Sequence, residues 1–168
     1  MHLNGSLTAA PLIERGPVVD VGSGGGSPGI PLAAARPDLV FHLLESSRKK
    51  CAFLEEIALD FPNVEVVCAR AEEHAAAAGR DAYATAVSRA LAPPPVAAEW
   101  CLPLVAPGGR VLLFVGPSAD ADPVARVARQ LGAEGPEQAD GVLVLRKVQA
   151  TPEGFPRRPG MAKKRPLA

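Results

Sequence analysis

The chain has 168 residues, of which 48% are apolar and 21% charged, so it is long and apolar enough to fold as one domain around its own core. This composition excludes a disordered chain, and no apolar run approaches the roughly 20 residues that a transmembrane helix needs. The formal net charge is zero. Because the first residues lack the basic and then apolar layout of a signal peptide, we expect a soluble, cytoplasmic protein.

Six short segments rich in β-branched and other apolar residues recur along the chain. They predict strands at Val18–Val21, Leu39–Leu44, Val64–Cys68, Ala84–Val87, Val111–Val115 and Val142–Val148. Glu45 ends the second of these segments, and the turn Pro107-Gly108-Gly109 introduces the fifth. Residues 117–123 and 133–141 are predicted as loops.

Helical patterns lie between the predicted strands. A first helix is predicted over Ile30–Ala35, and Ser46 or Ser47 can cap a second one. Four apolar residues share a face of that second helix, and four more repeat the pattern after Pro123: Phe53, Leu54, Ile57 and Ala58, then Val124, Val127, Ala128 and Leu131. Strands separated by helices favour a doubly wound α/β fold with a mostly parallel sheet. We assign this domain to residues 1–150 and residues 151–168 to an irregular, basic C-terminal tail.

The cysteines are Cys51, Cys68 and Cys101, which lie 17 and 33 residues apart. They form no C-x-x-C pair, and only three histidines could complete a metal site. Neither a structural zinc site nor a disulfide framework is therefore predicted. We interpret all three cysteines as reduced thiols, mostly in the core.

Charge is distributed unevenly along the chain. Residues 149–168 hold one acidic residue and five basic ones: Arg157, Arg158, Lys163, Lys164 and Arg165. Residues 1–148 hold 13 basic and 17 acidic residues, so a tail with a charge of +4 follows a body with a charge of −4. Such a tail suits a polyanionic partner, and a merely solvated terminus is the alternative.

The strongest chemical signal is a glycine-rich turn between the first predicted strand and the first predicted helix. Gly22, Gly24 and Gly26 allow the backbone to turn tightly and to approach a ligand more closely than any Cβ would permit. Glu45 lies 19 residues after Gly26, where its carboxylate can accept hydrogen bonds from a ribose diol. The combination favours a nucleotide-type ligand over a purely structural turn.

The residues around this turn narrow the choice of ligand. A phosphate-binding loop would need a lysine where Ile30 lies, and a dinucleotide fingerprint begun at Gly22 would need glycine or alanine where Ser27 lies. Asp20 precedes the first glycine by two residues, and an acid there suits a ligand with a cationic end. The ammonium and sulfonium of S-adenosylmethionine therefore fit this site better than NAD does.

Residues 25–29 also match the G-x-S-x-G nucleophile elbow of α/β-hydrolases, with Ser27 as the nucleophile. That mechanism uses the backbone N–H of the residue after the serine, and Pro28 has none. A hydrolase is therefore not expected.

Several motifs in order along the chain resemble one bacterial family. They are Asp20–Leu32, Leu43-Leu44-Glu45-Ser46, Arg70-Ala71-Glu72-Glu73, Val87-Ser88-Arg89-Ala90, and the C-terminal run Phe155-Pro156-Arg157, Gly160 and Lys164-Arg165-Pro166-Leu167. Together they are similar to the small-subunit ribosomal RNA guanine-N7 methyltransferases, also called glucose-inhibited division protein B. The resemblance covers nearly the whole chain.

This resemblance implies a Rossmann-like class I fold and methyl transfer from S-adenosylmethionine to N7 of guanine 527 of 16S ribosomal RNA. It implies that Gly22 and Ser27 line the cofactor pocket, that Ala71 and Glu72 flank the adenine, and that Arg89 borders the pocket. With Asp20, Gly24, Gly26 and Glu45 these are the predicted cofactor-binding residues. The five basic tail residues are predicted to contact RNA. The expected partner is 16S ribosomal RNA or the small ribosomal subunit, bound by a monomer without a membrane.

Guanine N7 has an available lone pair, so the reaction needs no general base, and we predict neither a catalytic base nor a metal. Two departures from the family stand out: a helical segment that usually precedes this point is absent from the sequence, and Val115-Gly116 replaces a lysine and glycine. Two alternatives therefore remain open. One is a methyltransferase of the same fold with a non-RNA substrate, and the other a remnant that binds cofactor or RNA without turnover.

Overall fold

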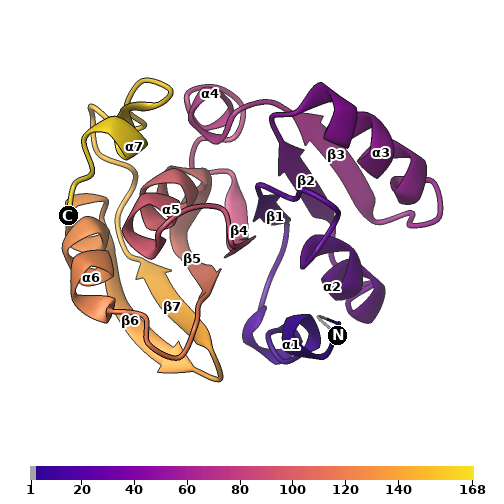
Figure 1. Ribbon diagram of the computed structural model, residues 1–168, viewed down its shortest axis with the longest axis horizontal. Coiled ribbons are helices and arrows are strands. Elements are labelled where there is room, and N and C mark those ends of the chain that lie inside the picture. Colours follow the sequence, from indigo (N-terminus) through magenta and orange to yellow (C-terminus); the bar gives the residue numbers. More distant parts are fainter. Residues whose placement is uncertain (1–2) are drawn as a thin grey trace.

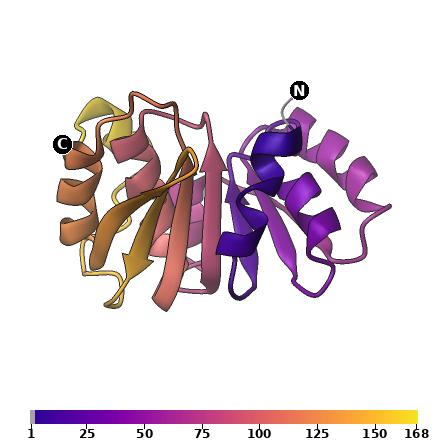
Figure 2. The ribbon, with the colours of Figure 1, turned by 90° about the horizontal axis from the view of Figure 1, so that it is seen from below.

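The computed structural model describes residues 3–168, which fold into one sheet with helices on both faces (Figures 1 and 2). The strands are β1 (Val18–Val21), β2 (Phe41–Glu45), β3 (Val64–Cys68), β4 (Tyr83–Arg89), β5 (Val105–Phe114), β6 (Ala133–Ala139) and β7 (Val142–Lys147). The helices are α1 (Leu3–Leu7), η1 (Ala10–Leu12), α2 (Gly29–Ala35), α3 (Arg48–Ala58), α4 (Ala71–Ala75), α5 (Pro94–Cys101), η2 (Leu102–Leu104), α6 (Ala121–Gln130) and α7 (Met161–Lys164). None of these helices is long and apolar enough to cross a membrane.

The strand order across the sheet is β3-β2-β1-β4-β5-β7-β6. The strands β1 to β5 are parallel, whereas β7 runs antiparallel to both of its neighbours. The order reverses between β1 and β4, and in open α/β sheets such a reversal marks the crevice where ligands bind. The prediction of a doubly wound, mostly parallel α/β fold is confirmed.

Two apolar cores lie on the two faces of the sheet, because successive strand residues point in opposite directions. On one face Val19 and Leu44 pack with residues of α4, α5 and α6. On the other face Val18 and Leu43 pack with residues of α2, α3 and η1. Figure 1 shows these helices on opposite sides of the strands.

The loop predicted at 133–141 is wrong, because most of this segment forms the edge strand β6. Its side chains are mostly exposed, and its register with β7 shifts between Glu134 and Glu137, on either side of Pro136. An edge strand of this kind needs no alternating apolar pattern and tolerates proline. Its sequence is therefore hard to distinguish from that of a loop.

The turn predicted at Pro107-Gly108-Gly109 lies inside β5, which begins at Val105. The register between β4 and β5 shifts in this region, between Tyr83 and Thr85. A strand with such an irregularity can contain proline and glycine, so the turn residues did not mark the start of the strand.

The helix predicted after Pro123 begins before it, at Ala121. The Asp120 carboxylate caps this helix by accepting a hydrogen bond from the Asp122 N–H at 3.0 Å. Pro123 fits in the first turn because the N–H groups there have no partner within the helix. The loop predicted at 117–123 is therefore too long.

The second predicted helix is α3, and Ser47 caps it as expected by accepting a hydrogen bond from the Lys50 N–H at 3.4 Å. Leu54 is fully buried on its inner face, as predicted. Phe53 was assigned to the same face, but it is 51% exposed. Adjacent residues on a helix point about 100° apart, so both could not face the sheet equally well.

The interpretation of the cysteines as reduced thiols is wrong for Cys51 and Cys68, which form a disulfide with 5.9 Å between their Cα atoms. The pairing of β2 with β3 places Cys68 beside Glu45, and α3 starts shortly after Glu45. This proximity arises from the fold, and the spacing of 17 residues gave no sign of it. Cys101 is a free thiol and is buried, as predicted.

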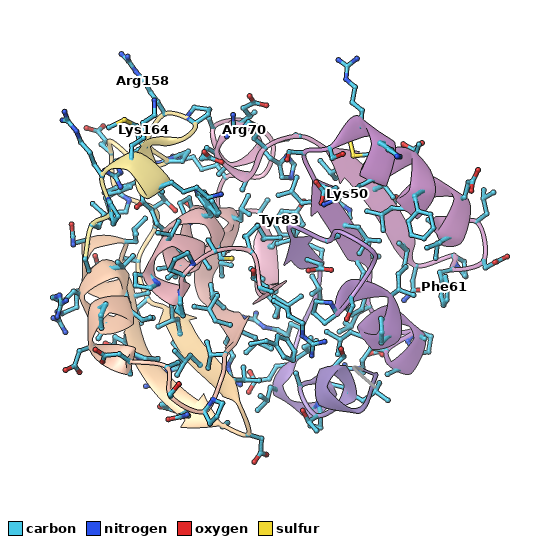
Figure 3. All side chains as sticks on the ribbon, viewed as in Figure 1. Lys50, Phe61, Arg70, Tyr83, Arg158 and Lys164 are labelled. Atoms are coloured by element: carbon cyan, nitrogen blue, oxygen red, sulfur yellow. A yellow bond between two sulfur atoms is a disulfide. The ribbon has the colours of Figure 1, made fainter. Side chains whose placement is uncertain are left out.

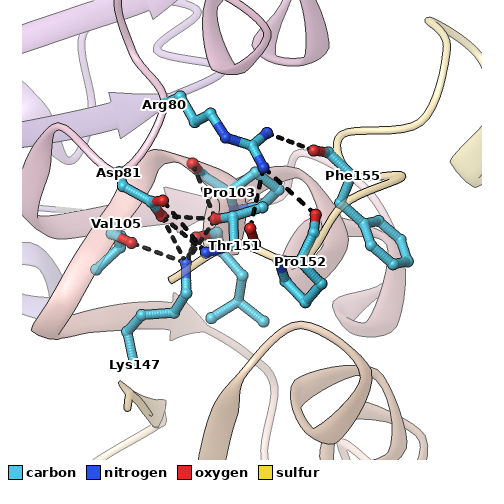
Figure 4. Close-up of polar contacts among 9 residues, drawn as sticks. Arg80, Asp81, Pro103, Val105, Lys147, Thr151, Pro152 and Phe155 are labelled. Atoms are coloured by element: carbon cyan, nitrogen blue, oxygen red, sulfur yellow. Dashed lines mark hydrogen bonds and ion pairs between the residues drawn. The ribbon is translucent and has the colours of Figure 1, made fainter. Parts of the chain in front are cut away.

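A buried polar network holds the chain after β7 against the domain (Figure 4). The fully buried Lys147 Nζ donates to the Asp81 carboxylate at 3.1 Å and to the Thr151 hydroxyl at 2.8 Å. Burial by itself would raise the pKa of the Asp81 carboxyl group. The hydrogen bonds from Thr151 and Lys147 outweigh this effect, so the net result is a pKa below the ordinary value. Arg80 adds bonds to the carbonyl oxygens of Thr151 and Pro152. The division at residue 150 stays a prediction, but the segment beyond it is fixed to the sheet.

Candidate cofactor cleft

A cleft of about 510 Å³ lies at the carboxyl ends of the parallel strands, where the strand order reverses. Seven of the nine residues predicted to bind cofactor line it: Gly22, Gly24, Ser27, Glu45, Ala71, Glu72 and Arg89. Asp20 and Gly26 do not line the cleft: Gly26 is a buried residue of the glycine turn, and Asp20 is buried under it. The fold thus brings together residues from four segments that are far apart in the sequence.

The glycine turn is tightly packed at one point and open at another. Gly22 has a φ of +74° and Gly24 a φ of +54°, conformations that L side chains rarely adopt. A Cβ on Gly22 would clash with the side chain of Leu91, whereas a Cβ on Gly24 would meet no atom closer than 3.9 Å. The absence of a side chain at Gly24 therefore leaves free space within the cleft.

Asp20 is fully buried under the turn. Its Oδ2 accepts a hydrogen bond from the Gly29 N–H at 3.0 Å, and its Oδ1 has no hydrogen-bond partner among the described residues. Burial raises the pKa of this carboxyl group to about 7, although the bond from Gly29 acts in the opposite direction. Strongly perturbed groups next to a cleft are candidates for functional roles.

Glu45 joins the glycine turn to the start of α3. Its Oε1 accepts a hydrogen bond from the Gly24 N–H at 3.0 Å, and its Oε2 accepts one from the Ser47 N–H at 2.8 Å. Each carboxylate oxygen has two acceptor positions. The group is therefore fixed in place and keeps the capacity to accept hydrogen bonds from a ribose diol.

Ala71 and Glu72 begin the short helix α4 at the side of the cleft. Glu72 is mostly buried, and its Oε2 accepts a hydrogen bond from the Gly160 N–H at 2.9 Å. Ala71 packs against a small apolar cluster that contains Trp100 and Ala162. The C-terminal segment thus contacts both residues that the resemblance places around adenine.

Arg89 ends β4 and connects the cleft to the neighbouring elements. Its Nη1 donates to the Ser27 hydroxyl at 3.3 Å, and its guanidinium carbon lies 4.8 Å from the centre of the Phe114 ring. Ala90 follows with a φ of +51°, which is strained for a residue other than glycine. The loop after β4 is therefore held in a defined conformation at the edge of the cleft.

Several lining residues were not predicted to bind cofactor: Lys50, Arg70, Leu91, Trp100 and Lys163. Among these five residues, only Lys163 had a predicted role, and that role was RNA contact. Lys50 belongs to α3 and Arg70 directly precedes α4, and both residues are labelled in Figure 3. A sequence pattern could not have found Lys163, because its helix is only four residues long.

The basic residues of the tail fall into two groups. Arg158, Lys163, Lys164 and Arg165 are exposed, and Figure 3 shows Arg158 pointing away from the molecule. Arg157 instead donates from Nε and Nη2 to the Glu99 carboxylate, at 2.6 Å in both bonds. The Glu99 side chain is only 4% exposed, so Arg157 neutralises a buried charge. RNA contact by the four exposed residues stays a prediction.

Among the described strands only β7 runs antiparallel to the others, a glycine turn follows β1, and an acid ends β2. These three features together define the class I S-adenosylmethionine-dependent methyltransferases. Solved structures agree on this fold. Coclaurine N-methyltransferase, bound to N-methylheliamine and S-adenosylhomocysteine, superimposes with a TM-score of 0.55 at 19% identity, covering 66% of this chain and 34% of that one. In the part of the chain that the structure describes, no group of three or more His, Cys, Asp or Glu side chains could hold a metal ion.

Sequence comparison defines the family more closely. The profile of GidB, rRNA small subunit methyltransferase G, matches residues 1–135. The ribosomal RNA small subunit methyltransferase G of Pelotomaculum thermopropionicum is 38% identical, with coverage of 99% of this chain and 77% of that protein. The protein of the same name from Carboxydothermus hydrogenoformans is 39% identical, with coverage of 89% and 70%. The chain therefore belongs to the rRNA small subunit methyltransferase G family, and its cofactor is S-adenosylmethionine.

Proposed function

We propose that this protein transfers a methyl group from S-adenosylmethionine to N7 of a guanine in 16S ribosomal RNA, at position 527 by resemblance to the family. The observation that carries the proposal is the Glu45 carboxylate, which two backbone N–H groups hold at the cleft between the glycine turn and α3. Family membership supports ribosomal RNA as the substrate class.

The cleft and the carboxyl group buried under the glycine turn fit S-adenosylmethionine in three respects. Gly24 leaves space that a side chain would fill. Glu45 retains acceptor capacity for the ribose hydroxyls. Asp20 places a buried oxygen without a partner next to the turn, where a cationic ligand would favour its ionised form. A pyrophosphate would be repelled by the ionised form of the same carboxyl group.

When bound, S-adenosylmethionine supplies an electrophilic methyl group on its sulfonium. Guanine N7 has a lone pair in the neutral base, so no side chain has to remove a proton before the methyl group is transferred. The residues of the cleft therefore have to orient the two partners and exclude water, and proximity of this kind can be worth about 7–11 kcal/mol. The Ser27–Arg89 hydrogen bond and the strained backbone at Ala90 hold the side of the cleft at the end of β4 in a defined conformation.

The exposed tail cations would neutralise RNA phosphates beside the cleft. Lys164 belongs to α7, Arg165 follows this helix directly and Arg158 precedes it. Lys50 and Arg70 line the cleft. Phosphate contacts of this kind position an RNA without selecting its sequence. We therefore propose that the partner is 16S ribosomal RNA or the assembled small subunit. The protein would act as a monomer in the cytoplasm, away from the membrane.

Small ribosomal subunits that lack the modification test the proposed substrate class. We expect the protein to transfer label from S-adenosylmethionine with a tritiated methyl group into the RNA of these subunits. Label in the ribosomal proteins, or in small molecules of a cell extract and not in the RNA, would favour a methyltransferase with another substrate. Cofactor binding without any transfer of label would identify a protein that has lost turnover.

A further inference from the structure

The short helix α7 contributes to the wall of the cofactor cleft. Lys163 of α7 and Trp100 of α5 both line the cleft. The Lys163 Nζ lies 5.4 Å from the centre of the indole ring, within the range of a cation–π interaction. Its ammonium group is therefore beside the cleft, whereas its neighbour Lys164 does not line it.

Several contacts fix the position of α7. The Gly160 N–H, directly before the helix, donates to Glu72 Oε2 at 2.9 Å. Upstream of it, Arg157 forms two bonds to the buried Glu99 carboxylate. The network around Thr151 holds the start of the segment (Figure 4). Lys163 is therefore carried by an anchored segment and not by a loose tail.

The surroundings of Lys163 suit a flat ring with hydrogen-bond acceptors. Trp100 and Ala162 belong to an apolar cluster, and Ala71 and Leu91 pack against it. The indole Nε1 of Trp100 is buried and has no hydrogen-bond partner among the described residues. An apolar wall with an ammonium donor beside it matches a purine, whose faces are apolar and whose ring nitrogens accept hydrogen bonds.

We infer that Lys163 is a specificity-determining residue for the adenine ring of the cofactor, to which its Nζ donates a hydrogen bond at a ring nitrogen. This inference rests on the proposed function, because it takes the cleft as the S-adenosylmethionine site. The C-terminal segment then serves the cofactor through Lys163 as well as the RNA through the exposed cations.

Calorimetry with S-adenosylhomocysteine, in the absence of RNA, tests this role. Lys163→Met keeps the length of the side chain and removes the ammonium group, and Lys164→Met is the matched control. We expect Lys163→Met to weaken binding about tenfold, the lower range for a charged hydrogen bond because Lys163 is exposed. Lys164→Met should bind like the parent protein. Lys163→Arg keeps a donor and should restore most of the affinity.

Fluorescence gives a second readout, because Trp100 is the single tryptophan of the sequence. Adenosine alone should change its emission, whereas homocysteine alone should not. Lys163→Met should weaken the response to adenosine by the same factor as the binding of S-adenosylhomocysteine. A purely structural role of α7 would instead lower the melting temperature of Lys163→Met, and Lys163→Arg would not restore the affinity. That pattern would overturn the inference.

The variant Glu45→Ala separates this inference from the proposed function. If Glu45→Ala loses S-adenosylhomocysteine binding and Lys163→Met retains it, the role of Lys163 is rejected and the cleft assignment stands. If both variants bind normally, the cleft assignment fails as well. Normal cofactor binding by Lys163→Met together with loss of methyl transfer would show that Lys163 contacts the RNA, and this result too would overturn the inference.

Discussion

Burial raises the pKa of Asp20 from an ordinary value of 3.8 to about 7. Between these pH values the folded chain retains a proton that the unfolded chain has released, so the free energy of unfolding should fall as the pH rises. The fall should total about 4 kcal/mol. Burial lowers the pKa of His74, which acts in the opposite sense, so a variant is needed to isolate Asp20.

Asp20→Asn provides this comparison, because its amide does not ionise. Urea denaturation at pH 5 and pH 8 should show that the variant gains stability relative to the parent protein as the pH rises. An equal pH dependence in both proteins would contradict a proton on Asp20.

Glu45 accepts two backbone hydrogen bonds and is expected to accept two more from the ribose. Each charged hydrogen bond contributes roughly 1.5–3 kcal/mol, so Glu45→Ala should weaken S-adenosylhomocysteine binding at least about tenfold. Calorimetry measures this loss, with Glu55→Ala on the exposed face of α3 as the control. Equal affinities of the two variants would mean that Glu45 only stabilises the turn.

At the level of elements, the disulfide between Cys51 and Cys68 links α3 to β3 across 17 residues. Closing a loop of about this length stabilises a protein by roughly 3 kcal/mol. Reduction should therefore lower the free energy of unfolding by about that amount, and Cys51→Ala/Cys68→Ala should not respond to reductant. Thiol titration of the unreduced, unfolded chain should find Cys101 alone, and three reactive thiols would contradict the pairing.

The elements that could be predicted from the sequence are those whose pattern depends on burial. β1 and β2 are mainly apolar because helices cover these parallel strands on both faces. The edge strand β6 is mostly exposed, so its sequence carries no such pattern. Seven of the nine predicted cofactor residues line one cleft because motifs at the ends of parallel strands meet at one edge. The contributions of Trp100 and Lys163 depend on how the C-terminal segment folds back, which no local pattern indicates.

For the whole molecule, the tail both docks on the domain and carries exposed charge, and two adjacent arginines separate these roles. Arg157→Ala leaves the buried Glu99 unpaired and should destabilise the protein by about 3 kcal/mol. Arg158→Ala should change stability by less than about 0.5 kcal/mol. It should reduce the slope of log K against log salt for RNA binding by about 0.7–0.9. Urea denaturation and filter binding measure the two effects, and identical behaviour of the two variants would contradict this division.

The product of methyl transfer tests the proposed function most directly. Small ribosomal subunits lacking the modification would be incubated with the protein and S-adenosylmethionine, and their 16S RNA digested to nucleosides and also cleaved chemically at N7-methylguanosine. We predict N7-methylguanosine as the new nucleoside and a single new cleavage at guanine 527. Glu45→Ala, measured in parallel, should yield little of either product. Another methylated nucleoside, or N7-methylguanosine at a different position, would contradict the proposed reaction.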